Sequence, residues 1–229
     1  MRLNPCIIFS SGIAASGKTS TMKELARRID NVFYIDRDDI NQANLHVADT
    51  RTPELPDFKD YVNNDSVDIE QLDTPFGNML RVNPNNAFYR RHIRDQSYLV
   101  QAQIAKTNLA LEKAVIFDCI TARQIQDGTL RKFMDYDILS GYSKHLIHFT
   151  ANEEDMYNRI IERAKSDPFA SKRVEFKRTS SRELFHKFVT EEQPMIPAEL
   201  KNYEHLLLNT SEDTIQNNVE RCMDYISKH

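Results

Sequence analysis

Eight consecutive residues near the N-terminus have the types and spacing of a phosphate-binding site. The segment Gly12-Ile13-Ala14-Ala15-Ser16-Gly17-Lys18-Thr19 fits the pattern G-x-x-x-x-G-K-[ST], in which backbone N–H groups surround nucleotide phosphates. Glycine permits the close approach that such a loop needs, and a following helix adds partial positive charge at its N-terminus. An ordinary glycine turn before a helix is the alternative explanation, and the flanking sequence argues against it.

The chemistry of such a loop gives individual residues their expected roles. We expect Lys18 to reach the β- and γ-phosphates and the Thr19 hydroxyl to ligate Mg²⁺. An apolar run precedes the loop and an amphipathic pattern follows it, so that a strand and a helix would hold it on either side. The expected nucleotide-binding residues are Gly12, Ala14, Ala15, Ser16, Gly17, Lys18, Thr19 and Ser20.

Two acidic positions lie where a parallel sheet would bring them toward the loop. Asp118 ends an apolar run, and an acid at the carboxyl end of a strand can hold Mg²⁺ or its water; capping of the next turn is the alternative. Asp38 follows another apolar run and could accept the proton of a hydroxyl acceptor, with Asp36 and Asp39 as substitutes. An acid-rich helix N-terminus would explain the same residues without catalysis.

Basic side chains gather in two further segments. Arg159 and Arg163 lie four residues apart on one helical face, and they begin a basic stretch that could close over a triphosphate. Arg91 and Arg94 lie three residues apart and could bind an anionic acceptor such as a phosphate or a carboxylate. In both segments a solvated charged face is the alternative explanation.

The remaining pattern alternates apolar strands with helices, which predicts an α/β fold with a parallel sheet covered on both faces. We expect one domain, 1–229, with an insertion at about 49–84 and a lid at about 159–187. The insertion is rich in proline and acidic residues, and either a solvated loop with short helices or a substrate-specific cap would explain it. The expected strands are 6–10, 32–35, 114–118, 146–149 and 206–208, and the expected helices are 18–29, 86–113, 123–139, 152–166 and 213–227.

Composition and charge limit the partners. With 229 residues, a net charge of −4 and a pI near 6, the chain is not expected to coat nucleic acid, although a local basic groove stays open. Cys6, Cys119 and Cys222 are widely spaced, which favours free thiols over disulfides or a metal site. The sequence contains no run of transmembrane length, so we expect a cytoplasmic protein without a membrane partner. The oligomeric state is left open.

Three separated segments resemble the P-loop kinases, especially the branch that holds polynucleotide kinase, zeta-toxin-like kinases and chloramphenicol phosphotransferase. They are the loop with its preceding strand, Phe33–Asp39 and Asn158–Arg163. The resemblance implies the three-layer P-loop NTPase fold, with a five-stranded parallel sheet of order 2-3-1-4-5 and a helical lid. It also implies that Asp38 is the base with Arg37 beside it, that Arg159 packs near the adenine, and that Arg163 reaches the phosphates.

The resemblance departs from the polynucleotide kinases on the acceptor side, where Asn41 replaces an arginine of their pattern. We expect an ATP- and Mg²⁺-dependent kinase that phosphorylates a hydroxyl of a small-molecule or nucleotide-like acceptor. A 5′-hydroxyl polynucleotide kinase, a zeta-toxin-like sugar-nucleotide kinase and an ATP-binding switch without an acceptor stay open as alternatives, as does the choice between ATP and GTP. The expected catalytic residues are Lys18, Asp38 and Arg163, and the expected acceptor-binding residues are Arg37, Arg91 and Arg94.

Overall fold

The chain forms two compact units. The first unit contains residues 1–35 and 104–229, and the second contains residues 36–103. The expected insertion at about 49–84 lies inside the second unit. The computed structural model describes residues 1–37, 39–40, 46–48, 71–74, 77–81, 94–166 and 181–228.

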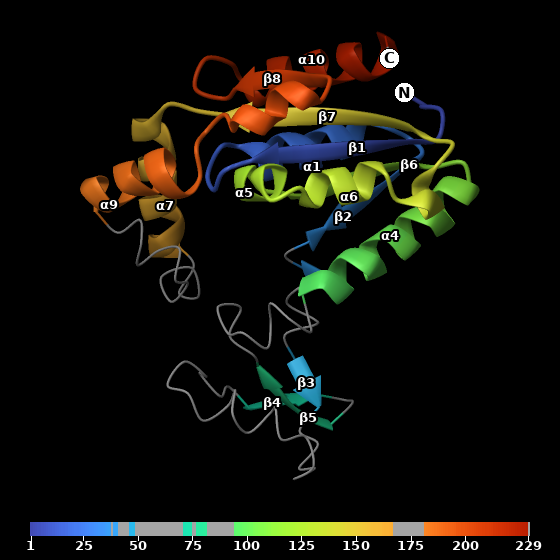
Figure 1. The fold of residues 1–229 in the computed structure, drawn as a ribbon, viewed down its shortest axis with the longest axis horizontal. Coiled ribbons are helices and arrows are strands. Elements are labelled where there is room, and N and C mark those ends of the chain that lie inside the picture. The colour runs from blue at the N-terminus through green and yellow to red at the C-terminus, as the bar shows by residue number, and fades with distance from the viewer. Residues whose placement is uncertain are drawn as a thin grey trace. The chain divides into compact units, whose positions relative to one another are not determined.

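A five-stranded parallel sheet of order β2-β6-β1-β7-β8 forms the centre of the first unit (Figure 1). Counted along these five strands alone, the order is 2-3-1-4-5, so the predicted fold class is confirmed. The middle strands are apolar on both faces, which suits a sheet covered on both sides. The strands are β1 (Cys6–Gly12), β2 (Val32–Asp36), β6 (Ala114–Ile120), β7 (Ser143–Thr150) and β8 (His205–Asn209).

Helices follow the strands in alternation, as the sequence pattern predicts. The helices expected at 18–29, 152–166 and 213–227 are observed with boundaries within two residues of the expected ones. The helices are α1 (Lys18–Arg28), α4 (Arg94–Ala110), α5 (Ala122–Gln126), α6 (Thr129–Met134), α7 (Glu153–Ser166), α9 (Arg182–Lys187) and α10 (Ile215–Lys228), with the 3₁₀ segments η2 (Asp137–Leu139) and η5 (Ala198–Asn202) and the π segment η4 (Phe188–Glu192).

Helices cover both faces of the sheet (Figure 1), and a buried apolar layer lies on each side of it. On one face Ile8 of β1 belongs to the same apolar cluster as Met22 of α1 and Val219 of α10. On the other face the ring of Phe9 stacks on Phe117 of β6 at 5.2 Å and packs against α6. Because successive strand residues point to opposite faces, Ile8 and Phe9 serve different layers.

The expected helix at 123–139 is wrong. The structure divides it into α5, α6 and η2, because local turn chemistry stops and restarts the chain. Thr121 caps α5 through a capping box with Gln124, and Gly128 begins α6 with φ of +75°. The expected helix at 86–113 is observed as α4, and its first residues, 86–93, lie outside the described residues.

The second unit holds a three-stranded antiparallel sheet of order β3-β5-β4. Two of its strands fall within the expected insertion, so the described residues there form strands rather than the short helices of the loop interpretation. The role of a substrate-specific cap stays a prediction. The strands are β3 (His46–Ala48), β4 (Gln71–Thr74) and β5 (Gly77–Arg81).

Cys6 and Cys222 are free and buried, and the prediction of free thiols is confirmed for these two residues. Burial raises the pKa of the Cys6 thiol to about 11 and that of Cys222 to about 12, so both behave as small apolar side chains. The side chain of Cys119 lies outside the described residues. Among the helices that the structure describes, none has the length and apolar character needed to span a membrane.

Candidate nucleotide site

The glycine loop connects the end of β1 to the start of α1, as predicted. Gly12 has φ of +144°, and a Cβ atom there would lie 2.5 Å from the backbone oxygen of Phe149. Gly17 has φ of +80° and precedes α1 without a side-chain cap. The first N–H groups of α1 therefore have no capping side chain in competition with a ligand, and both glycines are required by the backbone.

The residues between the two glycines show strain and an incomplete hydrogen-bond network. Ala15 has φ of +63°, a left-handed conformation that is uncommon for a residue with a Cβ atom. Ser16 is 1% exposed, and its Oγ has no hydrogen-bond partner among the described residues. Ala14 is half-buried and Ser20 is exposed. Strained backbone and an unpartnered buried hydroxyl in one loop are features that a bound ligand can explain.

Asp118 lies at the carboxyl end of β6, beside the loop. The Nζ of Lys18 is 3.7 Å from its Oδ1, and both side chains are largely buried. Ser10 of β1 donates a hydrogen bond to Oδ1 at 2.7 Å, and Tyr34 of β2 donates one to Oδ2 at 2.7 Å. The Thr19 hydroxyl also donates to this carboxylate. Because β6 lies between β1 and β2, both neighbouring strands contribute a donor.

These contacts keep the buried acid ionised. Burial alone would raise the pKa of Asp118, but the Lys18 ammonium and the hydrogen bonds from Tyr34, Ser10 and Thr19 together lower it below its ordinary value. The site therefore combines a cation, three hydroxyl groups and a carboxylate within a protected edge of the sheet. The alternative role of Asp118, capping the next turn, is not observed, because Thr121 caps α5.

The strand pairing changes register at this point. Ser10 pairs with Asp118, whereas Ser11 pairs with Ile120, so that Cys119 is an extra residue in β6. Such a bulge bends the strand and redirects its side chains, and bulges are frequent beside functional sites.

The oxygen atoms at this edge suit Mg²⁺. The Thr19 hydroxyl and the Asp118 carboxylate are hard ligands, and Mg²⁺ is usually held by one or two protein oxygens together with phosphates and water. Across the described ranges, no group of three or more His, Cys, Asp or Glu side chains could hold a metal ion alone. The donor set therefore fits a metal that arrives with its nucleotide.

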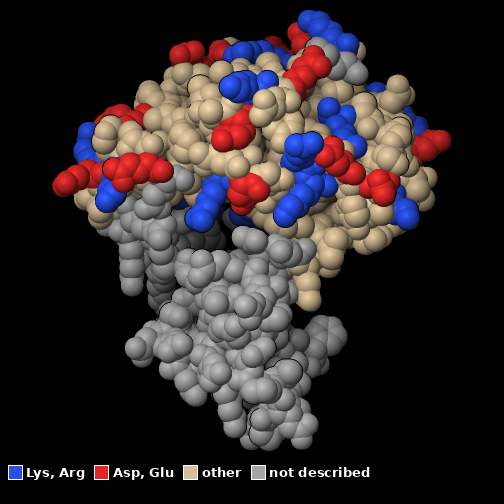
Figure 2. Space-filling view, in the orientation of Figure 1, with Lys and Arg blue, Asp and Glu red and all other residues tan. Residues whose placement is uncertain are grey.

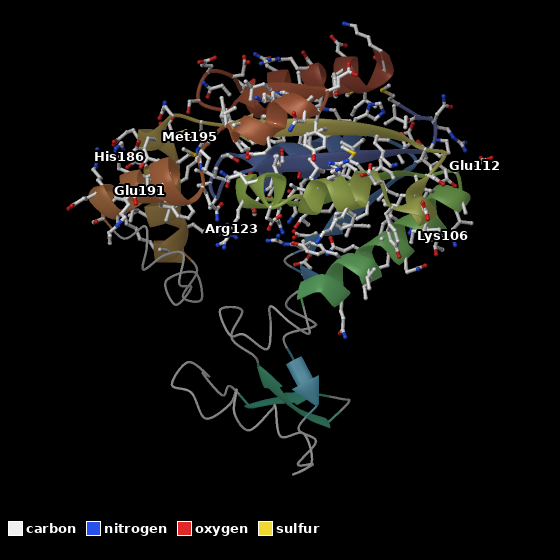
Figure 3. The ribbon with its side chains drawn as sticks, in the orientation of Figure 1. Lys106, Glu112, Arg123, His186, Glu191 and Met195 are labelled. Atoms are coloured by element: carbon white, nitrogen blue, oxygen red, sulfur yellow. The ribbon has the colours of Figure 1, made fainter. Side chains whose placement is uncertain are left out.

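A second buried polar cluster begins at the next residue of β1. The Ser11 hydroxyl lies 2.8 Å from Nδ1 of His148, and Nε2 of His148 lies 2.6 Å from the carbonyl oxygen of Met195. A carbonyl can only accept, so the ring donates from Nε2, and Nδ1 accepts from Ser11. Figure 3 shows Met195 in the segment that follows α9 and η4. The cluster thus connects the loop-bearing strand to that segment.

Burial keeps His148 neutral. It lowers the pKa of the ring to about 4 against the opposing effect of the Met195 carbonyl, with smaller contributions from His205 and Lys18. Of the two buried titratable groups beside β1, Asp118 on β6 is held charged and His148 on β7 is held neutral.

Arg159 of α7 contacts the loop from outside. Its Nη1 donates to the backbone oxygen of Ala15 at 3.1 Å and to Oγ1 of Thr210 at 2.9 Å, and its Nη2 donates to the backbone oxygen of Thr210 at 3.1 Å. Apolar contacts support this placement, because Ile13 of the loop shares a buried cluster with Met156 of α7. Helix α7 is therefore packed against the loop, which places Arg159 beside it, and the predicted role of Arg159 near the adenine stays a prediction.

Other basic residues of the expected lid are engaged elsewhere. Arg182 forms an ion pair with Glu154 and lies over the ring of Tyr157, and Lys165 pairs with Glu162 at 2.7 Å. For these two residues the charged-face explanation holds. Arg163 is exposed one turn beyond Arg159, and its role stays a prediction. The expected lid residues 167–180 lie outside the described residues.

The acceptor-side predictions fall on the second unit. Asp38 and Arg91 lie outside the described residues, and so does the side chain of Arg94, the first residue of α4. Arg37 is half-buried and Asp39 is exposed. The structure therefore brings Lys18, Thr19, Asp118 and Arg159 together at the loop, and it leaves Arg163 and the predicted acceptor-side residues as proposals.

Three residues of the described site were not predicted from the sequence, namely Ser10, Tyr34 and His148, and no contact with the loop was predicted for Thr210. Strand periodicity could have suggested Tyr34, because it precedes Asp36 by two residues and shares its face. No local motif marks Ser10 or His148, since both look like ordinary members of a buried strand. Thr210 follows β8 in a turn whose relation to the loop depends on the sheet order.

Comparison with known proteins establishes the fold. No protein-family model and no curated protein sequence matches this chain. A candidate kinase from Chloroflexus aurantiacus has a similar structure, with a TM-score of 0.56 and 14% identity over 97% of this chain and 99% of that chain. The protein APE1195 gives a TM-score of 0.52 and 15% identity over 98% of this chain and 96% of its own. At this identity, the similarity shows a shared α/β fold.

Proposed function

We propose that this protein is an ATP- and Mg²⁺-dependent kinase that transfers the γ-phosphoryl group to a hydroxyl of a small-molecule or nucleotide-like acceptor. The observation that carries the proposal is the contact of Lys18 and Thr19, from the glycine loop, with Asp118 of a different strand. A glycine turn without a ligand has no need for a buried cation and a buried carboxylate. A triphosphate and its metal need both.

The roles on the donor side follow from the chemistry of the groups. The loop N–H groups and Lys18 would bind the phosphates, and Thr19 and Asp118 would hold the magnesium ion. When bound, Mg²⁺ supplies positive charge next to the β- and γ-phosphates. Arg163 would stabilise the charge of the transferring group, and Arg159 would border the nucleotide. Catalysis would consist mostly of positioning and charge stabilisation.

The acceptor side is proposed from sequence alone. Asp38 would orient the acceptor hydroxyl and accept its proton, with Arg37, Arg91 and Arg94 available for an anionic group on the acceptor. The segment around Asp38 and the pair of arginines on α7 support membership of the polynucleotide kinase, zeta-toxin and chloramphenicol phosphotransferase branch.

Surface charge favours a small acceptor over nucleic acid. Figure 2 shows Lys and Arg intermingled with Asp and Glu over the described residues on that face, and the net charge of the chain is −4. A protein that tracks a nucleic-acid backbone concentrates basic side chains on one surface. A cytoplasmic small-molecule kinase is therefore the preferred proposal, and the 5′-polynucleotide kinase is the alternative that the sequence segment favours.

The proposal is tested by transfer from γ-labelled ATP to a panel of nucleosides, sugars, antibiotics, sugar nucleotides and 5′-hydroxyl oligonucleotides. Wild type should label one class, and EDTA should abolish the labelling. Labelling of oligonucleotides with strong salt dependence would select the polynucleotide kinase. Labelling of sugar nucleotides would select the zeta-toxin-like kinase. ATP binding without any labelled product across the panel would contradict the kinase and favour a regulatory switch.

Asp38→Asn tests the proposed base. The variant should bind ATP as wild type does and lose transfer by about 100-fold or more, because removal of a general base typically costs that much. Asp39→Asn is the matched control, since it removes the neighbouring acid. If Asp38→Asn kept full transfer activity and Asp39→Asn lost it, the base would be Asp39 and not Asp38.

A further inference from the structure

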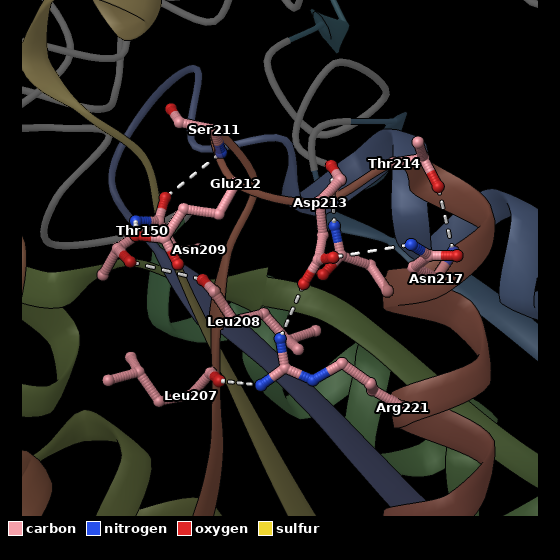
Figure 4. A network of polar contacts seen from close by, with 11 residues as sticks. Thr150, Leu207, Leu208, Asn209, Ser211, Glu212, Asp213, Thr214, Asn217 and Arg221 are labelled. Carbon is pink, nitrogen blue, oxygen red and sulfur yellow. Dashed lines mark hydrogen bonds and ion pairs between the residues drawn. The ribbon is translucent and has the colours of Figure 1, made fainter.

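The turn after β8 is held by a dense set of hydrogen bonds (Figure 4). The N–H of Thr210 donates to the backbone oxygen of Thr150 at 2.9 Å. The side chain of Asn209 accepts from the N–H of Ser211 at 3.1 Å and donates to Glu212 at 2.7 Å. The backbone of Thr210 is therefore fixed by both the neighbouring strand and the turn itself.

From this fixed position, the Thr210 side chain packs directly onto the glycine loop. A Cβ atom on Gly17 would lie 2.9 Å from both Cγ2 and Oγ1 of Thr210. The Thr210 hydroxyl donates to the backbone oxygen of Ser16 at 3.0 Å and accepts from Nη1 of Arg159 at 2.9 Å. Arg159 in turn binds the backbone oxygen of Ala15. Two successive carbonyl groups of the loop are thus held from outside.

Because of the geometry of the peptide bond, contacts with the loop carbonyl groups also fix the direction of the loop N–H groups. In a planar trans peptide, the C=O and the following N–H point in opposite directions. When Thr210 holds the carbonyl of Ser16, the N–H of Gly17 is directed away from Thr210. The same contacts bind the loop at Ala15, whose backbone has the uncommon left-handed conformation.

We propose that Thr210 is a positioning residue of the phosphate-binding loop, which acts through the Ser16 carbonyl and Arg159. The inference rests on the proposed nucleotide site. Thr210 touches neither phosphate nor metal in this role. It fixes the direction of the loop N–H groups before a phosphate arrives, so that binding does not have to order them.

The substitution Thr210→Val tests this role, because it keeps the side-chain shape and removes the hydroxyl. We expect the Kd for ADP, measured by calorimetry, to rise about fivefold, in line with the loss of one or two hydrogen bonds. Thr210→Ser keeps the hydroxyl and should restore most of the affinity. Thr150→Val is the matched control, since its hydroxyl donates to the Leu208 carbonyl at 3.3 Å and not to the loop.

A purely structural role predicts a different pattern. It would lower the melting temperature of the free protein in Thr210→Val, and the Kd for ADP would stay at the wild-type value; that result overturns the inference. In the double variant with Arg159→Ala, the rise in Kd should be smaller than the product of the two single effects, because the residues act together. A rise equal to that product would contradict action through Arg159.

The two proposals fail in distinguishable ways. If wild type binds ADP but Thr210→Val binds it equally well, only the role of Thr210 is rejected. If wild type binds neither ADP nor ATP with Mg²⁺, the proposed function is rejected, and the role of Thr210 is rejected with it.

Discussion

Two adjacent serines of β1 begin two buried polar clusters of opposite character. Ser10 donates to Asp118 on one neighbouring strand, and Ser11 donates to His148 on the other. Both titratable groups are nearly inaccessible to solvent. Asp118 nevertheless stays charged, because Lys18 and several donors surround it, whereas burial keeps His148 neutral against the opposing effect of the Met195 carbonyl.

The two clusters therefore have different expected roles within one sheet, one in the chemistry of the site and one in the stability of the fold. Burial opposes charge on both residues, so the charge of Asp118 depends on specific partners that also belong to the proposed nucleotide site. The neutral His148 instead connects β7 to the segment after η4. We expect substitutions in the Asp118 cluster to change activity most, and changes in the His148 cluster to alter stability with pH.

The largest expected effect is that of Lys18→Ala. The variant loses the cation that would bind the phosphates and that lowers the pKa of Asp118. We expect kcat/KM for phosphoryl transfer to fall by about 10²–10³-fold, as is typical for removal of a charge-stabilising donor. Carbon-detected NMR titration should show a higher pKa for the Asp118 carboxyl.

Lys106→Ala is the matched control for this prediction, since Lys106 is an exposed lysine on α4 (Figure 3). Its transfer rate should equal that of wild type. An unchanged kcat/KM in Lys18→Ala would contradict the assignment of the glycine loop as the donor site.

The next effect is a loss of stability at mildly acid pH. The folded-state pKa of His148 is about 4 and its ordinary value is 6.5, so protonation favours the unfolded chain. The stabilisation of the folded chain by the neutral ring is complete above pH 6.5. It is lost as the pH falls toward 4, and the free energy of unfolding falls by about 3 kcal/mol in total. Urea unfolding at a series of pH values measures it.

The variant His148→Gln should lack this pH-dependent loss, because a glutamine amide does not titrate. His186→Gln replaces an exposed histidine (Figure 3) and should leave the loss in place. The lowered pKa of Asp118 also makes the folded chain less stable as the pH falls, but only at a lower pH, below the ordinary pKa of 3.8. If the free energy of unfolding of His148→Gln fell as steeply as that of wild type between pH 6.5 and 4, the neutral role of His148 would be rejected.

The smallest expected effects are those of removing one hydroxyl group from the Asp118 cluster or from the His148 cluster. Tyr34→Phe removes one of several donors to Asp118, and we expect a loss of about 1 kcal/mol in unfolding free energy with a modest rise in the pKa of Asp118. Ser11→Ala removes the donor to His148 and should lower stability while the pKa of Asp118 stays unchanged. A shift of the Asp118 pKa in Ser11→Ala would show that the clusters are coupled.

The sequence predicted the parts of the molecule that depend on local pattern. The spacing of Gly12, Gly17, Lys18 and Thr19 predicted the strand, loop and helix, since each step is fixed by neighbouring residues. Apolar runs predicted the five strands and placed Asp118 at the end of one of them. Short-range turn chemistry at Thr121 and Gly128 was visible but was outweighed by a weak helical pattern, and this produced the wrong helix at 123–139.

Only the tertiary structure decided which distant residues share the site. Tyr34 and Ser10 reach Asp118 because β6 lies between β1 and β2, an order that no single segment encodes. Thr210 meets Gly17 across 193 positions of the chain because a turn at the edge of the sheet packs onto the loop. Local sequence determines the backbone conformation of each segment, whereas contacts between segments depend on how the whole core packs. The glycine loop was therefore predictable, and the side chains that hold it in place were not.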